Sequence, residues 1–305
     1  MNNEEFNPLL PKAAMVYFED AENFELRQYL RAVGLRSCLE NVINTIFIYL
    51  SQDENKVDEQ AKIKWNKKRL VDKINSMNHY FSEEISDKLH RIRKLGNKGA
   101  HPNSHSSLSN NDLESCIEDL SKICEWTILA CFIKYGFSTK PWIPTVFSTL
   151  PPIYRIRILE NLHKEYIIRI EDKKEIINYL DYLHTMIFLG IEQPIDTIQN
   201  PKYIQIQQIL LTIDKLAMAY LKNGDYSKSI KFIENCYNDN IVNSIFKDQM
   251  LDKLEMLHQD FDILPISKGL SDTRTKLKEL LPAIKDEEKS LFLTLFTAIL
   301  IEEAS

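Results

Sequence analysis

The residues whose types and spacing best fit chemistry lie in "IRKLGNKGAHP", residues 92–102. Gly96 and Gly99 stand three residues apart, just before His101, in a chain that contains only seven glycines. Cationic side chains precede the histidine, namely Arg91, Arg93, Lys94 and Lys98. Histidine titrates near neutral pH, and neighbouring cations favour its neutral form. A neutral imidazole beside cations suits general-base action on a phosphodiester, so we predict a site for phosphate chemistry at His101.

The two glycines also bear on the backbone that must position this histidine. Glycine disfavours helix by about 1 kcal/mol relative to Ala, so the preceding helix is expected to end near Leu95. Gly96 and Gly99 then permit left-handed backbone angles, or the close approach of another segment or a phosphate. Pro102 fixes the exit. We therefore expect His101 to be held at a constrained bend.

A supporting pair of charged residues is predicted on an earlier helix. Arg36 and Glu40 are one helical turn apart, and their face continues with Ile43 and Phe47. Both charges are therefore expected to point partly inward, where they need partners. Two arrangements are open at this point: the pair forms a structural salt bridge, or it reaches the bend at residues 97–101.

A second group of basic residues surrounds Trp65. Between residues 62 and 73, six cationic side chains stand against one acid, Asp72. Such a run is either a solvated helix face or a set of phosphate contacts. In the second interpretation the nucleic-acid-binding residues are Lys64, Lys67, Lys68, Arg69, Lys94 and Lys98. The formal net charge of −6 argues against a general nucleic-acid coat protein.

No metal or cofactor site is predicted. His101 and His105 are four residues apart, but Pro102 and the loop setting disfavour helical metal ligation. The sequence contains no P-loop, GxGxxG, HExxH or GxSxG motif. The cysteines are odd in number and include no CxxC pair, which predicts small core residues in a reduced, cytoplasmic setting; they are Cys38, Cys116, Cys124, Cys131 and Cys236. No membrane span or signal peptide is expected.

Composition predicts an all-α fold, because glycine and proline are few and β-branched residues seldom alternate with polar ones. Apolar periodicity predicts one long helix over 20–50 and a second helical region over 66–95, broken near residues 75–84. A third helix is expected over 111–135, with Asn111 as its N-cap and Gly136 closing it.

Four prolines between residues 138 and 152 predict a linker, since proline removes a backbone donor and disfavours helix in the residue before it. This divides the chain into an N-terminal helical bundle over 1–137, the linker over 138–152, and a second helical domain over 153–305. The terminal residues 289–305 form an apolar segment that serves either as core or as an oligomer seam.

One stretch of the second domain, residues 213–239, resembles a single tetratricopeptide-type helical hairpin. Gly224 is expected to adopt a positive φ in its turn. Two facing stripes line the hairpin, Leu216, Ala217 and Tyr220 against Ser229, Ile233 and Cys236. Ser229 occupies the place of the family's small alanine, and no second copy recurs at a regular period. An ordinary helical bundle is the open alternative.

Two blocks in order, "RAVGLRSCLENVINTIF" (31–47) and "LHRIRKLGNKGAHP" (89–102), carry a further resemblance. They resemble a helical domain of unknown function that occurs alone and at the front of type I restriction-enzyme motor subunits. That domain is placed in the HEPN superfamily. The resemblance covers about residues 10–137, and its matching positions are Arg36, Leu39, Glu40, Arg93, Gly96, Asn97, Ala100 and His101.

The resemblance implies a bundle of four to five helices that is often dimeric. Many relatives are metal-independent endoribonucleases of toxin–antitoxin, abortive-infection and CRISPR systems, in which an Arg and a His four to six residues apart cut RNA. Here Gly96 stands four intervening residues before His101, and Arg93 stands seven before it. In the catalytic interpretation His101 is the acid/base, Arg93 stabilises the phosphorane charge and Asn97 holds the phosphate or orients the histidine.

Two functions therefore remain open. The first is a helical interaction and oligomerisation module of a multi-component restriction or anti-phage system. It forms a homodimer through the N-terminal bundle and binds a protein partner through the C-terminal helices. The second is an RNA-binding or RNA-cleaving protein, with Arg93, Asn97 and His101 as catalytic residues. Arg36, Glu40, Gly96 and Gly99 then support the catalytic group.

Overall fold

The computed structural model describes residues 8–50, 59–101, 108–137, 142–168, 201–239, 241–242, 244–263 and 269–283. Every element in these ranges is a helix, and none of them contains a strand, which confirms the all-α prediction. The chain divides into two compact units, Met1–Cys131 with Leu277–Ser305, and Phe132–Lys276. The division falls inside a helix, some residues before the predicted end of the first domain. Each unit is described by itself below.

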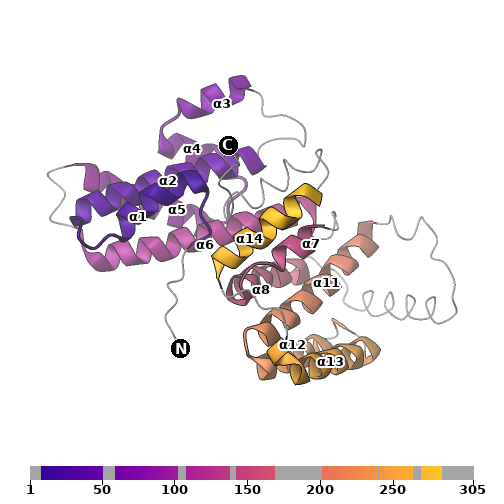
Figure 1. The fold of residues 1–305 in the computed structure, drawn as a ribbon. Helices are drawn as coiled ribbons and strands as arrows, with labels where there is room; N and C mark the ends of the chain where they lie inside the picture. Colours follow the sequence, from indigo (N-terminus) through magenta and orange to yellow (C-terminus); the bar gives the residue numbers. More distant parts are fainter. Residues whose placement is uncertain are drawn as a thin grey trace. The chain divides into compact units, whose positions relative to one another are not determined.

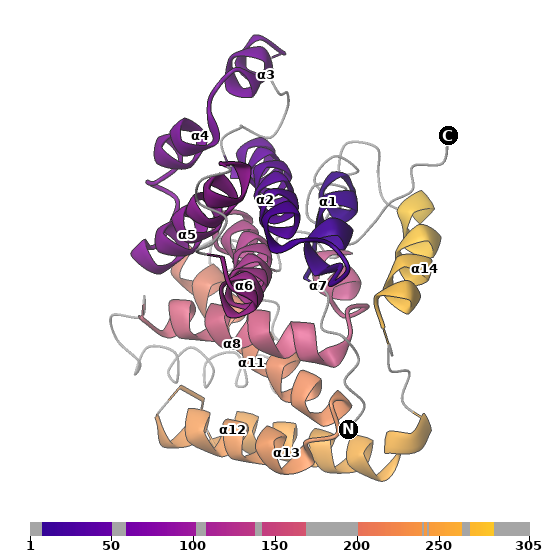
Figure 2. The same ribbon diagram turned by 90° about the vertical axis from the view of Figure 1, so that its left-hand side faces the viewer.

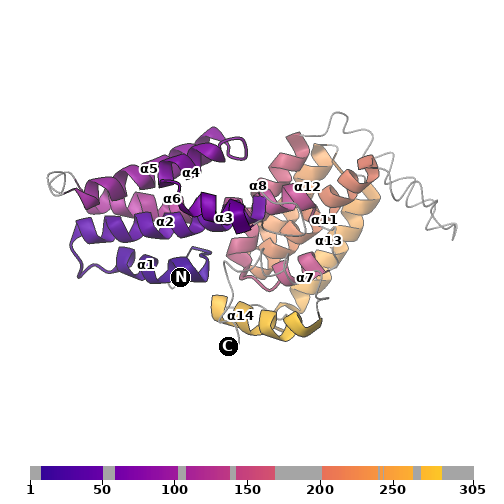
Figure 3. The same ribbon diagram turned by 90° about the horizontal axis from the view of Figure 1, so that it is seen from above.

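Unit 1 is a bundle of long helices with two short ones. Its elements are α1 (Lys12–Glu22), α2 (Gln28–Leu50), α3 (Glu59–Asn66), α4 (Leu70–Ser76), α5 (Glu83–Ala100) and most of α6 (Asn110–Tyr135). Helix α2 packs against both α1 and α5, and α4 contacts α5 and α2. Figures 1 and 3 show α1, α2 and α5 running side by side. The predicted apolar stripe of α2 is confirmed as core, since Leu35, Leu39 and Ile46 are fully buried.

The long helix predicted over 20–50 is interrupted. Helix α1 ends at Glu22 and α2 begins at Gln28. Between them the Asn23 side chain accepts a hydrogen bond from the Glu25 backbone N–H at 2.9 Å, and the Leu26 N–H donates to the Asn23 carbonyl at 3.1 Å. Asparagine side chains compete with helix in this way by bonding to nearby backbone. The prediction missed this turn because the apolar periodicity runs through it.

The start of α6 also differs from the prediction, whereas its end is confirmed. Ser109, not Asn111, caps the helix: its hydroxyl accepts from the Asp112 N–H at 3.1 Å and donates to the Asp112 carboxylate at 2.7 Å. The capping residue thus stands two residues before the predicted one. At the other end Gly136 has φ of +83°, and its N–H donates to the Phe132 carbonyl at 2.8 Å.

Unit 2 is a layered set of helices. Its elements are α7 (Trp142–Phe147), α8 (Pro152–Ile168), α11 (Pro201–Lys222), α12 (Tyr226–Asn238), α13 (Ser244–Gln259), the short turn η2 (Phe261–Ile263) and the first part of α14 (Leu270–Leu280). The turn η3 (Leu281–Ala283) follows α14. Helix α11 packs on α8 and on α12, and α13 contacts both α11 and α12. Figure 2 shows α11 lying between α8 and the α12–α13 pair.

The proline-rich segment is not a free linker over residues 142–152. It contains α7 and the start of α8, and Ile143, Phe147 and Leu150 are buried. The Phe147 ring meets the Phe132 ring edge-to-face at a centroid distance of 5.2 Å. Prolines are compatible with this arrangement because a helix tolerates proline in its first turn, where no N–H donor is needed. The apolar residues between the prolines therefore fold into the core of unit 2.

The helical hairpin expected at 213–239 is formed by the end of α11, a short turn and α12. Gly224 has φ of +83°, as predicted. Asp225 caps α12 by accepting a hydrogen bond from the Lys228 N–H at 2.9 Å. Across the hairpin the buried Ser229 hydroxyl donates to the Ala217 carbonyl at 2.7 Å. Small residues thus bring the two helices together.

Some predictions concern residues outside the described ranges, namely the apolar segment 289–305 and residues 102–107 with Pro102 and His105. Among the described helices, none has the length and hydropathy needed to cross a bilayer. All five cysteines are buried, as predicted for core residues. Burial raises the pKa of the Cys38 and Cys236 thiols to about 12.

Candidate functional site

Helix α5, which carries the predicted site, does not end at Leu95. It begins after Ser82, whose hydroxyl accepts from the Ile85 N–H at 3.3 Å, and continues to Ala100. Gly96 and Gly99 lie inside the helix, and neither has a positive φ. The predicted glycine bend is therefore wrong. Tertiary packing outweighs the helix-disfavouring propensity of about 1 kcal/mol per glycine.

The glycines instead allow α2 and α5 to approach each other. A Cβ atom built at Gly96 would lie 2.2 Å from the Arg36 Cβ and 3.0 Å from the Ala32 carbonyl oxygen. One built at Gly99 would lie 2.7 Å from the Tyr29 carbonyl oxygen. Since real Cβ atoms do not come this close to other atoms, only glycine fits either position. We call this contact between α2 and α5 the glycine seam.

Of the two arrangements left open for Arg36 and Glu40, the salt bridge between them is not formed. Glu40 instead accepts a hydrogen bond from the buried Lys73 ammonium at 2.7 Å, and Lys73 also donates to Asn44 at 3.1 Å. Arg36 lies on Gly96 at the glycine seam, and its buried Nε has no hydrogen-bond partner among the described residues. The pair thus splits: Arg36 meets α5, and Glu40 ties α2 to α4.

His101, the predicted acid/base, lies exposed at the C-cap of α5. Its backbone N–H donates to the Lys98 carbonyl at 3.3 Å. Its side chain has no hydrogen bond or ion pair with the described residues. Arg93 lies about 12 Å away along the helix axis, given about 1.5 Å of rise per residue. The half-buried Arg93 Nε approaches His90 Nδ1 at 3.4 Å. The structure therefore brings Arg93 to His90, not to His101, with half-buried Asn97 one turn further along α5.

His90 is a histidine that the sequence interpretation passed over. Burial lowers its pKa, and the nearby Arg93 and Lys94 lower it further, while Asp87 raises it. His90 borders a groove of about 480 Å³ between α5 and α6, whose charged lining includes Arg91, Lys94, Lys98, Asp87 and Asp112. The Arg91 side chain is paired with the buried carboxylate of Asp119. The only signal for this position in the sequence was a histidine directly after Leu89 on a predicted helix.

The basic group around Trp65 proves to surround a core anchor. Trp65 is only 4% exposed, stacks on Phe47 at a centroid distance of 3.9 Å, and donates its indole N–H to Asn44 at 2.8 Å. Lys68 lies 5.3 Å above the Trp65 ring. Lys64, Lys67, Lys68 and Arg69 are all exposed, and Arg69 is paired with Asp72 at 2.8 Å. This arrangement is typical of a solvated surface, although Lys67, Lys68 and Arg69 lie between α3 and α4 and not on a helix.

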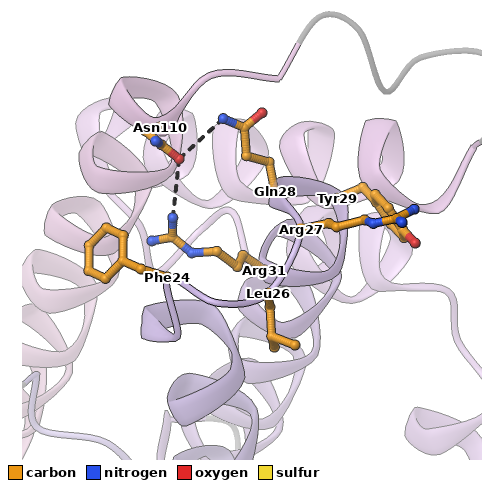
Figure 4. A pocket seen from close by; sticks show the side chains of 7 residues that line it. All are labelled: Phe24, Leu26, Arg27, Gln28, Tyr29, Arg31 and Asn110. Carbon is orange, nitrogen blue, oxygen red and sulfur yellow. Dashed lines mark hydrogen bonds between the residues drawn. The ribbon is translucent and has the colours of Figure 1, made fainter.

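Arg31 is the second residue that the sequence interpretation missed. It is 1% exposed and lies at the end of unit 1 where α2 and α6 begin (Figure 4). A pocket of about 400 Å³ surrounds it, with a lining that includes Phe24, Arg27, Gln28, Tyr29 and Asn110. The signal was its register, because Arg31 stands one helical turn before Leu35 on the apolar stripe of α2.

With these sites described, the chain can be compared with known families. It is an all-α protein in which residues 27–150 match the family model "Domain of unknown function (DUF4145)". The matched region starts at the first turn of α2 and extends through α7. No curated protein and no solved structure matches the chain.

Proposed function

We propose that the chain is a helical interaction module that pairs with a second copy of itself through unit 1 and binds a partner protein through unit 2. The glycine seam carries this proposal. Gly96 and Gly99 were the strongest sign of a catalytic bend, and close packing of α5 on α2 accounts for both of them. The exposed His101 and its distance from Arg93 likewise favour a role without catalysis.

The proposed self-association uses the outer face of α1. Val16 is 65% exposed and Tyr17 is 40% exposed, although both are large apolar side chains on an ordered helix. Exposed apolar residues that adjoin one another mark interaction surfaces more often than those scattered singly. A second copy of the chain is the occupant that the family resemblance favours, since relatives are often dimeric.

The proposed partner surface lies on the layered helices of unit 2. Ile204 on α11 and Met256 on α13 are 43% and 59% exposed. Successive antiparallel helices of this kind present broad side-chain surfaces, as tetratricopeptide-like arrays do. Ser229 in the small-residue position and its contact with Ala217 support the tetratricopeptide-like assignment as part of this proposal. The resemblance to restriction-associated domains points to a partner in a multi-component defence system.

Sedimentation velocity on the full chain tests the self-association. We expect a dimer for the wild type and a monomer for Val16→Asp, because a carboxylate in an apolar interface is left without a partner. Ile63→Asp is the matched control: Ile63 is 54% exposed, also in unit 1, but on α3. It should remain dimeric. A wild type that stays monomeric at about 100 μM, well above ordinary dissociation constants, would contradict the proposal.

A second candidate, RNA cleavage, is favoured by one observation. Half-buried Arg93 and Asn97 share a flank of α5 with His90, whose neutral form is favoured by burial. In this candidate Arg93 and Asn97 hold the phosphate, and His101 or His90 transfers the proton. Cleavage of single-stranded RNA would be compared among the wild type, His101→Ala, His90→Ala and the exposed control His79→Ala. Equal activity in all four would eliminate it.

A further inference from the structure

The pocket around Arg31 has the chemical features of an anion site, independently of the function proposed above. Figure 4 shows the Arg31 guanidinium between the Phe24 ring and Asn110, at the start of α2. Nε donates to the Ala21 carbonyl at 2.8 Å, and Nη1 donates to the Asn110 side-chain oxygen at 3.2 Å. These two bonds hold the guanidinium in place and tie α2 to the end of α1 and to the start of α6.

The third nitrogen has no such role. Nη2 of Arg31 is buried and has no hydrogen-bond partner among the described residues. Leaving a buried donor unpaired destabilises a protein, and more so when the donor is charged. Such a group calls for an explanation. The side chain is itself 99% buried, given its 1% exposure, so bulk water does not supply the missing acceptor.

Phe24 provides a cover that can be removed. Its ring centroid lies 4.4 Å from the Arg31 Cζ, which is a weak cation–π contact for an exposed ring. The ring accepts no hydrogen bond in the plane of the guanidinium. Because Phe24 is 73% exposed, it can rotate away without disturbing the core of unit 1.

The surroundings of Nη2 are suited to negative charge. Arg27, directly before the first residue of α2, is exposed at the pocket's rim. Its carbonyl accepts from the Leu30 and Arg31 N–H groups at 2.9 and 3.2 Å. The first turn of α2 is the positive end of the helix dipole, which favours an anion. Asn110 already accepts from Gln28 at 3.2 Å as well as from Arg31. Burial lowers the pKa of Arg31, and Glu114 and Glu22 only partly offset this effect; neither carboxylate accepts from Nη2.

We propose that this pocket binds a compact oxyanion, the phosphate or carboxylate group of a small molecule, with Nη2 of Arg31 as its central donor and Arg27 at its rim. The oxyanion supplies the acceptor that Nη2 lacks. Charge-assisted bonds of this kind are short and about twice as strong as neutral ones. Phe24 moves off the guanidinium when the anion enters.

Nuclear magnetic resonance on the full chain, labelled with ¹⁵N-arginine, tests this directly. Inorganic phosphate and acetate are titrated separately, with chloride at equal ionic strength as the reference. We expect the Arg31 Nε–H resonance, assigned by its absence in Arg31→Lys, to shift saturably with phosphate, acetate or both. A response to phosphate alone identifies phosphate esters as ligands, and a response to acetate identifies carboxylates. Shifts no larger than those with chloride would overturn the proposal.

Substitutions of the exposed rim residues test the proposal in variants that should fold like the wild type. Arg27→Ala should raise the dissociation constant about threefold to tenfold, as expected for a partly exposed charge. Phe24→Ala should lower it about twofold to fivefold, because the cation–π contact no longer competes. Arg69→Ala removes another exposed arginine, directly before α4, and should change nothing. Identical affinities in all three variants would also overturn the proposal.

Discussion

In unit 1, α2 and α5 approach each other over Gly96 and Gly99, whereas in unit 2, α11 and α12 approach over Ala217 and Ser229. At the glycine seam a single added Cβ would lie 2.2–3.0 Å from neighbouring atoms. In the α11–α12 hairpin a serine fits, and its hydroxyl donates to the facing carbonyl. The backbones of unit 1 are therefore close enough to exclude any side chain, and those of unit 2 leave space for one hydroxymethyl group.

The difference shows that glycine has two separate uses in this chain. Gly96 and Gly99 have ordinary helical angles and are required because of a neighbouring helix. Gly224 has φ of +83° and nothing within 4 Å of its missing Cβ, so it is required only because of its own backbone. Sequence alone does not separate these two uses, since the Gly96–Gly99 pair and Gly224 all follow apolar helical stretches.

The largest expected effect is at the glycine seam. Replacing both Gly96 and Gly99 by Ala should lower the free energy of unfolding by about 3–5 kcal/mol, because overpacking at each position outweighs the gain of about 1 kcal/mol in helix propensity. Urea unfolding followed by circular dichroism measures this. Double-alanine protein as stable as the wild type would show that the two helices are further apart than described.

Two further variants sharpen the measurement. Gly269→Ala is the matched control, because nothing lies within 4 Å of its missing Cβ, and it should change stability by less than about 0.5 kcal/mol. Combining Gly96→Ala with Arg36→Gly removes the nearest clashing atom. The cost of Gly96→Ala should be smaller in that background, as a positive coupling in a double-mutant cycle.

Histidines extend the comparison, because His101 of unit 1 is exposed and His163 of unit 2 is half-buried. Burial lowers the pKa of His163 to about 4, although Asp239 raises it slightly. Its Nδ1 is buried and unpaired among the described residues, and its ring meets Phe232 at 5.2 Å. Between pH 6.5 and 4 the unfolded chain binds the additional proton, so stability falls as the pH falls.

The expected loss is about 1.4 kcal/mol per pH unit below 6.5, or about 2 kcal/mol at pH 5. His163→Phe should remove this part of the acid sensitivity, and His101→Phe should leave it in place. Urea midpoints measured from pH 7 to pH 5 test both variants. Parallel pH profiles for the wild type and His163→Phe would contradict the burial of this imidazole.

Gly224→Ala should have an intermediate effect. A left-handed backbone costs an L-residue about 1–2 kcal/mol, and the open space around Gly224 does not reduce that cost. Gly224→Asn should cost less, because asparagine tolerates this conformation. Thermal unfolding of the two variants compares them. Equal midpoints for Ala and Asn would mean that crowding, not φ, sets the cost.

Ser229→Ala should have the smallest effect. It removes one buried hydrogen bond but leaves the Ala217 carbonyl with its helical partner, so we expect a loss of about 1 kcal/mol. Ser227→Ala, on the exposed side of α12, is its control. Hydrogen exchange of the α11 and α12 amides locates the effect. A loss above about 3 kcal/mol would place Ser229 in the same packing class as the glycine seam.

The sequence predicted many of the residues of the candidate site but not which of them contact one another. The sequence indicated that residues 92–101 carry cations, glycines and a histidine, and that Arg36 faces inward. It left Arg36 either paired with Glu40 or reaching residues 97–101, and its catalytic interpretation placed Arg93 beside His101. In the structure Glu40 pairs with Lys73, and Arg93 pairs with His90. Partners distant in sequence are invisible to local periodicity, because they depend on which helices become neighbours.

Sequence by itself determined the helical class, the buried stripe of α2, and the turns at Gly136 and Gly224, since each follows from local periodicity or from one residue's allowed angles. Tertiary structure alone decided that α5 runs through its glycines, that α7 joins a core, and that Arg31 is buried with an unpaired nitrogen. The physical reason is that packing between helices contributes more free energy than local propensity, which differs by only about 1 kcal/mol per residue.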